Sequence, residues 1–148
     1  MQLCAIPNVV GLKFTDFDLY RMRYIKQSGA LIFNGRDEVL AAGLLMGADG
    51  GIGTFYNIVP ELFVELYIFA LRGDWMGARA VQDRVNAIVR ATLRFPGFPA
   101  IKQILRWSGI DCGQCIRPRA GLTPEQTSEL RRSLEECGLE LDRPVVRV

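Results

Sequence analysis

Lys13 is the residue of this chain that could most directly support covalent chemistry. It lies inside the alternating apolar stretch VVGLKFT at residues 9–15, where a lysine is not expected. In an enclosed interior, desolvation disfavours the charged form of an amine, and a neutral amine attacks a ketone to form a Schiff base. On an edge strand, the same lysine would instead discourage aggregation. The pattern alone leaves both interpretations open.

Histidine is absent from the 148 residues, which restricts the remaining chemistry. Triads that contain histidine, metal sites with histidine ligands and the usual general base are excluded. Cys112 and Cys115 form a single CxxC motif with no second pair, so a four-ligand zinc site is not supported. We interpret these two residues as loop cysteines, and we expect neither a metal ion nor a cofactor.

Two further polar segments follow Lys13 along the chain. Asp37 and Glu38 lie at the expected start of a helix, where acidic side chains interact favourably with the helix dipole and need no other role. The segment GADGGIGTF at residues 47–55 lacks the GK[ST] of a phosphate-binding loop and the glycine spacing of a dinucleotide fingerprint. Small residues that line an interior beside a ligand explain it better.

The elements that must position these residues alternate between strands and helices. We predict strands within residues 9–15, 30–35 and 49–55, and each is followed by a helical pattern. The third helix, PELFVELYIFALRG at residues 60–73, is apolar on nearly all sides and is therefore expected to be buried. This alternation indicates a parallel sheet with right-handed crossovers.

Three more helices are expected after the last alternating unit. Asp74 caps the first of them, Pro99 starts the second, and Thr123 opens the third with capping-box spacing. Within the first of these helices, one stripe is apolar and consists of Val81, Val85, Ile88 and Val89. We therefore divide the chain into βα units at residues 1–73, a helical extension at 74–138 and a tail at 139–148.

Composition constrains the class of protein and its surroundings. A content of 49% hydrophobic and 23% charged residues is typical of a globular domain, and a net charge of +2 favours neither a nucleic-acid nor a membrane partner. The chain has no apolar run that could span a bilayer and no secretory signal at its start. Four cysteines in so apolar a chain do not resemble a disulfide framework, so we expect a reduced, cytoplasmic location.

Three motifs resemble motifs of the N-acetylneuraminate lyase and dihydrodipicolinate synthase superfamily of class I aldolases. The resemblance is to the C-terminal half of those proteins only. They are GLKFT at residues 11–15, FNGRDE at 33–38 and GGIGTFYN at 50–57, and the similarity extends from Ile6 to about Gly138. The NGxDE element is typical of the sialic-acid lyases. The resemblance implies an α/β fold that forms the C-terminal part of a (β/α)8 TIM barrel, strands six to eight, with additional C-terminal helices.

The same resemblance implies a reaction. Lys13 matches the lysine that forms a Schiff base with the C2 ketone of pyruvate or of an open-chain 2-keto acid, which allows the C3–C4 bond to break. The positions that match substrate-binding residues are Thr15, Gly35, Asp37, Glu38 and Thr54. The expected activity is that of a carbon–carbon lyase that cleaves a 2-keto sugar acid of the N-acetylneuraminate type to pyruvate and an aldehyde sugar.

The resemblance covers only part of a barrel. A complete barrel needs about 250 residues, and the family's strands one to five, carboxylate-binding turn and proton-transfer tyrosine have no counterpart in this sequence. We therefore expect a truncated chain that has little or no lyase activity alone. Its open sheet edges invite association, so we expect a homo-oligomer or pairing with a half-barrel that carries the missing part.

Two alternatives remain open at this point. The chain could belong to a sibling 2-keto acid aldolase, a dehydratase or a dihydrodipicolinate synthase-like enzyme, with Arg36 adjusting specificity towards an acidic or differently hydroxylated sugar. It could also be a non-catalytic half-barrel that acts as a partner subunit.

Overall fold

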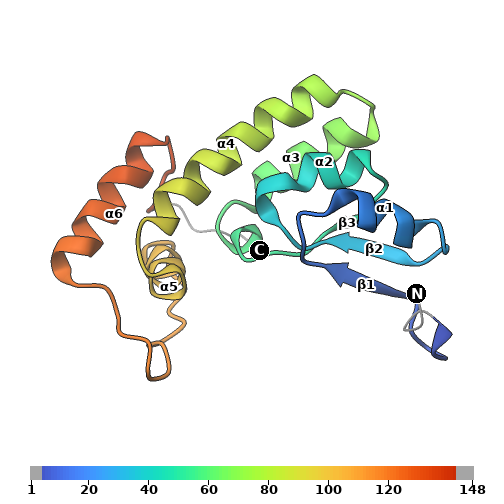
Figure 1. Cartoon of the computed structure of the whole chain (residues 1–148). Coiled ribbons are helices and arrows are strands. Elements are labelled where there is room, and N and C mark those ends of the chain that lie inside the picture. The colour runs from blue at the N-terminus through green and yellow to red at the C-terminus, as the bar shows by residue number, and fades with distance from the viewer. Residues whose placement is uncertain (1–4, 143–148) are drawn as a thin grey trace.

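The computed structural model describes residues 5–142 as an α/β fold (Figure 1). Three parallel strands form a sheet in the order β1-β2-β3, namely β1 Gly11–Phe14, β2 Leu31–Asn34 and β3 Gly50–Gly51. Six helices are interspersed with or follow these strands, namely α1 Leu19–Lys26, α2 Leu40–Leu45, α3 Pro60–Leu71, α4 Trp75–Leu93, α5 Gly97–Trp107 and α6 Pro124–Glu136. The predicted order of strands and helices is therefore present.

The two faces of the sheet differ in what covers them. Phe14 and Ile32 point towards α1, where they pack with Met22 in a small apolar cluster. Lys13 pairs with Phe33 in the parallel register and therefore points to the opposite face. Helices α1, α2 and α3 lie on one side of the sheet (Figure 1). Lys13 points to the other side and is exposed.

Two element boundaries differ from the predicted ones, each for a local reason. The third strand contains only two residues. The predicted strand cannot extend to Phe55, because Thr54 has helical backbone angles and the short helical turn η3 Phe55–Asn57 begins directly after it. Helix α5 begins at Gly97 rather than at Pro99. Pro99 lies in the first turn, where the missing N–H of proline leaves no helical hydrogen bond unmade.

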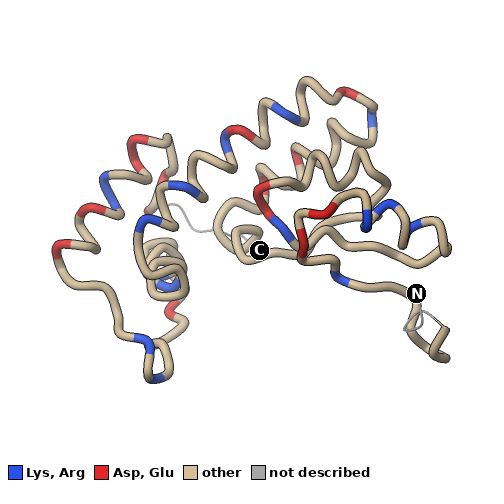
Figure 2. The backbone as a smooth tube through the Cα atoms, viewed as in Figure 1, with Lys and Arg blue, Asp and Glu red and all other residues tan. Residues whose placement is uncertain are grey.

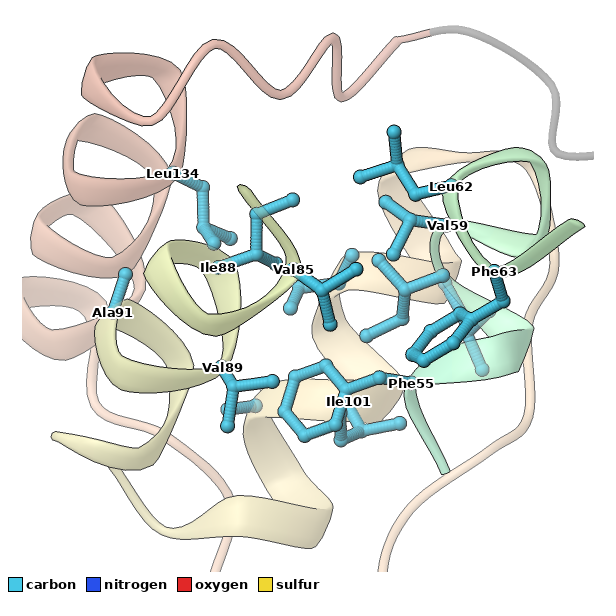
Figure 3. Close-up of a cluster of buried hydrophobic side chains, with 14 of the residues drawn as sticks. Phe55, Val59, Leu62, Phe63, Val85, Ile88, Val89, Ala91, Ile101 and Leu134 are labelled. Carbon is cyan, nitrogen blue, oxygen red and sulfur yellow. The ribbon is translucent and has the colours of Figure 1, made fainter. Parts of the chain in front are cut away.

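Most of the apolar core lies among the helices, where the predicted stripe of α4 packs against α3, α5 and α6. Figure 3 shows Val85, Ile88 and Val89 of this stripe facing Phe63 and neighbouring side chains. The cluster also contains Leu134 of α6 and Ile101 of α5. It extends on both sides of residue 73, so the predicted division there separates sequence segments that share one core.

Helix α3 is less buried than its composition predicts, and that expectation was wrong. Leu62, Phe63 and Leu66 are buried, but 58% of Val64 and 70% of Leu71 are exposed. The reason is that α2, η3 and α4 pack against one side of α3. Its other side remains open in the described chain.

The predicted tail at residues 139–148 is partly anchored. Leu141 is buried and Leu139 packs against the helical core, whereas residues 143–148 lie outside the described part of the chain. Charges of both signs occur along α4 and α6 (Figure 2). None of the helices within residues 5–142 is both long and apolar enough to cross a membrane.

An ion pair joins the last residue of α1, Lys26, to Asp49, the residue that directly precedes β3. The Lys26 ammonium lies 2.6 Å from the Asp49 carboxylate, which also accepts a hydrogen bond of 2.7 Å from the Ile32 N–H. The hydrogen bond from Lys26, together with that from Ile32, lowers the pKa of Asp49. Asp49 therefore stabilises the fold above its unfolded pKa of about 3.9, and this contribution is lost as the pH falls through the lower folded pKa.

Replacing Asp49 by asparagine should lower the free energy of unfolding at pH 7 by about 1 kcal/mol, because both side chains are partly exposed and solvent weakens the pair. Urea denaturation of both proteins from pH 7 to pH 3 measures this. The difference should shrink as the pH falls below about 4. A difference that is constant with pH would contradict the role of the ionised carboxylate.

Candidate active site

Lys13 lies on the edge strand β1, and its side chain reaches the C-terminal end of β2. A Cβ atom built on Gly35 would be 3.1 Å from Lys13 Cε, so the lysine stem lies directly beside this glycine. The expected enclosed interior is not present in the described chain, because Lys13 is exposed and points away from the face that α1 covers. The edge-strand interpretation and the catalytic one are therefore both compatible with its position.

The amine of Lys13 differs from the amines of the other two lysines, because it has no partner among the described residues. Lys26 is paired with Asp49, and Lys102 donates hydrogen bonds to the carbonyl oxygens of Cys112 and Gln114. Lys13 has no hydrogen bond or ion pair with any residue between 5 and 142. Within these residues, no partner of its own holds the Lys13 amine in place.

Gly35 brings the ends of β1 and β2 together. Its N–H donates a 2.8 Å hydrogen bond to the Phe14 carbonyl, and a Cβ at this position would overlap Thr15 Oγ1. Glycine is required here because the two chain segments approach so closely. The structure therefore places Lys13, Thr15 and Gly35 next to one another.

Asp37 follows in the short helical turn η2 Asp37–Val39 and is almost fully buried. Its Oδ2 accepts a 2.9 Å hydrogen bond from the Phe55 N–H, while no described residue donates to Oδ1. Burial raises the pKa of Asp37, and the Phe55 N–H and the charge of Lys13 oppose this rise. Because the carboxylate binds the β3 loop rather than the start of its own helix, a simple helix-dipole role does not explain it.

Gln82 and Asn86 of α4 hold the backbone of the acidic segment, and the sequence analysis missed both. The Gln82 amide donates to the Asp37 carbonyl and accepts from the Ala41 N–H, each at 2.9 Å. Asn86 donates to the Glu38 carbonyl at 3.0 Å. The available signal was two amides four residues apart beside the apolar stripe of α4, which places them on one helical face.

The remaining predicted site residues, Glu38 and Thr54, are the chain neighbours of the two residues joined by the Asp37–Phe55 hydrogen bond. Glu38 is half-buried, and its backbone is anchored by Asn86. Thr54 is exposed and directly precedes Phe55, whose N–H binds Asp37. All the predicted site positions therefore lie at the C-terminal ends of the three strands or in the loops that follow, where parallel barrels carry their active sites.

The glycines of the β3 segment make room for side chains of the protein itself. A Cβ on Gly51 would overlap the Tyr56 hydroxyl, and one on Gly53 would overlap the Asp37 carboxylate. Burial raises the pKa of Tyr56, and the nearby charge of Asp37 adds to this rise. The expectation that these small residues serve only to leave space for a ligand was therefore incomplete.

Replacing Gly53 by alanine should push Asp37 away from the Phe55 N–H and destabilise the fold by about 1–3 kcal/mol. Gly50→Ala is the matched control, because its Cβ would meet only the Phe33 ring at 3.4 Å, an ordinary contact. Urea denaturation of the two variants provides the comparison. Equal stabilities would show that the Asp37 carboxylate moves without cost.

Comparison with known proteins identifies the group to which the chain is related. Residues 1–137 match the Dihydrodipicolinate synthetase family. The N-acetylneuraminate lyase of Rhizobium meliloti strain 1021 is 32% identical over 136 residues, which cover 90% of this chain and 46% of that protein. The chain thus spans about half the length of the curated relatives it matches.

Solved structures give the same relationship. N-acetylneuraminate lyase from Fusobacterium nucleatum complexed with pyruvate has 27% identity and a TM-score of 0.85, over 91% of this chain and 47% of that one. A catalytic lysine mutant of Ruminococcus gnavus sialic acid aldolase has 26% identity and a TM-score of 0.85, over 93% and 47%. From its motifs, its fold and these matches, the chain belongs to the dihydrodipicolinate synthetase family.

Proposed function

We propose that this chain carries the Schiff-base lysine of an aldolase-type lyase and that Lys13 is that residue. Its amine adds to C2 of a 2-keto acid and water leaves, which forms a protonated imine. The C4 hydroxyl then loses its proton, the C3–C4 bond breaks to release an aldehyde, and the bonding electrons pass to the imine as an enamine. Protonation at C3 and hydrolysis return pyruvate and the free lysine.

The observation that carries this proposal is the free amine of Lys13 beside Gly35 and Thr15, at the strand ends where Asp37 is also held. Carboxylate and hydroxyl oxygens are suitable partners for sugar hydroxyls. We therefore assign substrate binding to Thr15, Gly35, Asp37, Glu38 and Thr54. Related proteins support the assignment, since one is named for a catalytic lysine and another was solved with pyruvate. A 2-keto sugar acid of the N-acetylneuraminate type is the substrate we favour.

We further propose that the three strands correspond to strands six to eight of a (β/α)8 barrel. Within the described residues, β1 and β3 each pair only with β2, so both outer edges of the sheet are free to pair with further strands. Such pairing would cover Lys13 and remove water from its surroundings. We therefore expect lyase activity only when a complementary half-barrel, or an oligomer that supplies one, completes the site.

Borohydride reduction in the presence of pyruvate tests the proposal. The chain should gain the mass of one reduced pyruvate adduct, and peptide mapping should place it on Lys13. Pyruvate release from N-acetylneuraminate should then be measured with and without the N-terminal half of a related lyase. A chain that forms no pyruvate adduct, whether alone or together with that N-terminal half, would contradict the proposed role of Lys13.

A non-catalytic partner subunit is the second candidate function. The observation that favours it is the exposure of large apolar side chains on α1 and α3, where 81% of Tyr20 and 70% of Leu71 are accessible. If this function is correct, the chain should bind a full-length relative stably and form no pyruvate adduct in the complex. Size-exclusion chromatography of the mixture, followed by reduction, distinguishes the two functions.

A further inference from the structure

Arg36 is a cation at the strand ends that the proposed reaction does not use. It lies between Gly35 and Asp37, and its guanidinium carbon is 4.5 Å from the centre of the Phe17 ring. Its Nε is buried without a hydrogen-bond partner, and no carboxylate in residues 5–142 forms an ion pair with it. The side chain is therefore held in place by the ring while its charge remains unpaired.

The acidic residues nearest to Arg36 in the sequence and in the adjoining loop make other interactions. Asp37 accepts from the Phe55 N–H, Asp18 caps α1 through the Arg21 N–H at 2.9 Å, and Asp16 accepts from the Phe17 N–H at 2.7 Å. Each of these three carboxylates therefore has a backbone donor of its own, and the Glu38 carboxylate forms no ion pair with Arg36. The charge of Arg36 has no equivalent partner among the described residues.

Arg36 also joins the two loops that carry the candidate site. Phe17 follows Thr15 in the loop after β1, and Arg36 follows Gly35 in the loop after β2. The stack of ring and guanidinium spans the two strand ends that present Lys13 and Asp37. A guanidinium offers a planar set of donors that matches a carboxylate or a phosphate. Stacking on an aromatic ring orients those donors in advance.

We propose that Arg36 binds a second anionic group, a carboxylate or a phosphate, at the end of the 2-keto acid remote from the carbon that Lys13 attacks. This inference rests on the proposed function and narrows its substrate class from 2-keto sugar acids in general to those with a charged far end. Phe17 fixes the guanidinium, and Asp37 binds the hydroxyls between the two ends.

Borohydride trapping on the full chain with three matched compounds tests the inference. They are 2-keto-3-deoxygluconate, 2-keto-3-deoxyglucarate and 2-keto-3-deoxy-6-phosphogluconate, which end in a hydroxyl, a carboxylate and a phosphate. Adduct mass is measured against ligand concentration. At least one charged compound should half-saturate Lys13 at a concentration about tenfold lower than the uncharged one, a difference that corresponds to one charge-assisted contact. The carboxylate and phosphate arms show which of the two groups is preferred.

Arg36→Gln should abolish this preference while the adduct with pyruvate itself is retained, and Arg36→Lys should restore part of it. Arg90→Gln, at an exposed position of α4, is the matched control and should keep the preference. If pyruvate forms an adduct but the three compounds half-saturate equally, or if Arg36→Gln leaves the preference intact, the inference is overturned and the Lys13 assignment stands. If no compound, including pyruvate, forms an adduct with the chain, either alone or together with the N-terminal half of a related lyase, both are overturned.

Discussion

Replacing Lys13 by arginine is expected to eliminate the pyruvate adduct that borohydride traps. The guanidinium keeps the positive charge and much of the length of the side chain, but it stays protonated at pH 7 and therefore presents no neutral amine. The adduct should fall by a factor on the order of 100 or more, to the background of non-specific labelling. Intact-mass spectrometry after reduction measures the loss directly.

Lys102→Arg is the control for this substitution. Lys102 is half-buried on α5 and donates to two loop carbonyls, far along the chain from the strand ends. Its replacement should leave the adduct unchanged, and circular dichroism should show that both variants retain their helices. Labelling that persists in Lys13→Arg and maps to Lys26 or Lys102 would mean that the reaction is non-specific.

Replacing Leu66 by alanine is expected to destabilise the protein by about 2–5 kcal/mol. Leu66 is fully buried in α3, within the apolar cluster that this helix shares with α4. Removing its side chain loses the free energy of burial and leaves a cavity that the surrounding helices fill only in part. Because the same cluster includes α5 and α6, we expect the unfolding transition to shift as a whole.

Leu71→Ala is the matched control, since Leu71 lies in the same helix but is 70% exposed. Its replacement should change the free energy of unfolding by less than about 0.5 kcal/mol in the monomer. Urea denaturation at two protein concentrations measures both variants and reveals any association through α3. Equal losses of stability would contradict the packing of α3 described here.

The local features of the fold could be predicted from sequence because they depend on neighbouring residues. Asp74 and Thr123 cap α4 and α6 as predicted, each by accepting a hydrogen bond from a backbone N–H three residues ahead. The buried stripe of α4 follows from helical periodicity in the same way. The grouping of Lys13, Thr15 and Gly35 follows from strand alternation and from the parallel order of the strands.

The contacts between distant segments could not be predicted, because periodicity does not encode them. The amide of Gln82 holds the Asp37 backbone from 45 residues away, and the lack of a side chain at Gly53 leaves room for the Asp37 carboxylate. The exposure of α3 likewise depends on which elements pack against it.

By itself, the sequence determined which residues could react and on which side of each strand or helix they lie, since these follow from side-chain type and backbone period. Only the tertiary structure decided which faces are covered. It placed Lys13 on the open face of the sheet, Asp37 in a buried position and the charge of Arg36 over Phe17. Burial and charge pairing are properties of segments brought together by folding, and they set the reactivity of each group.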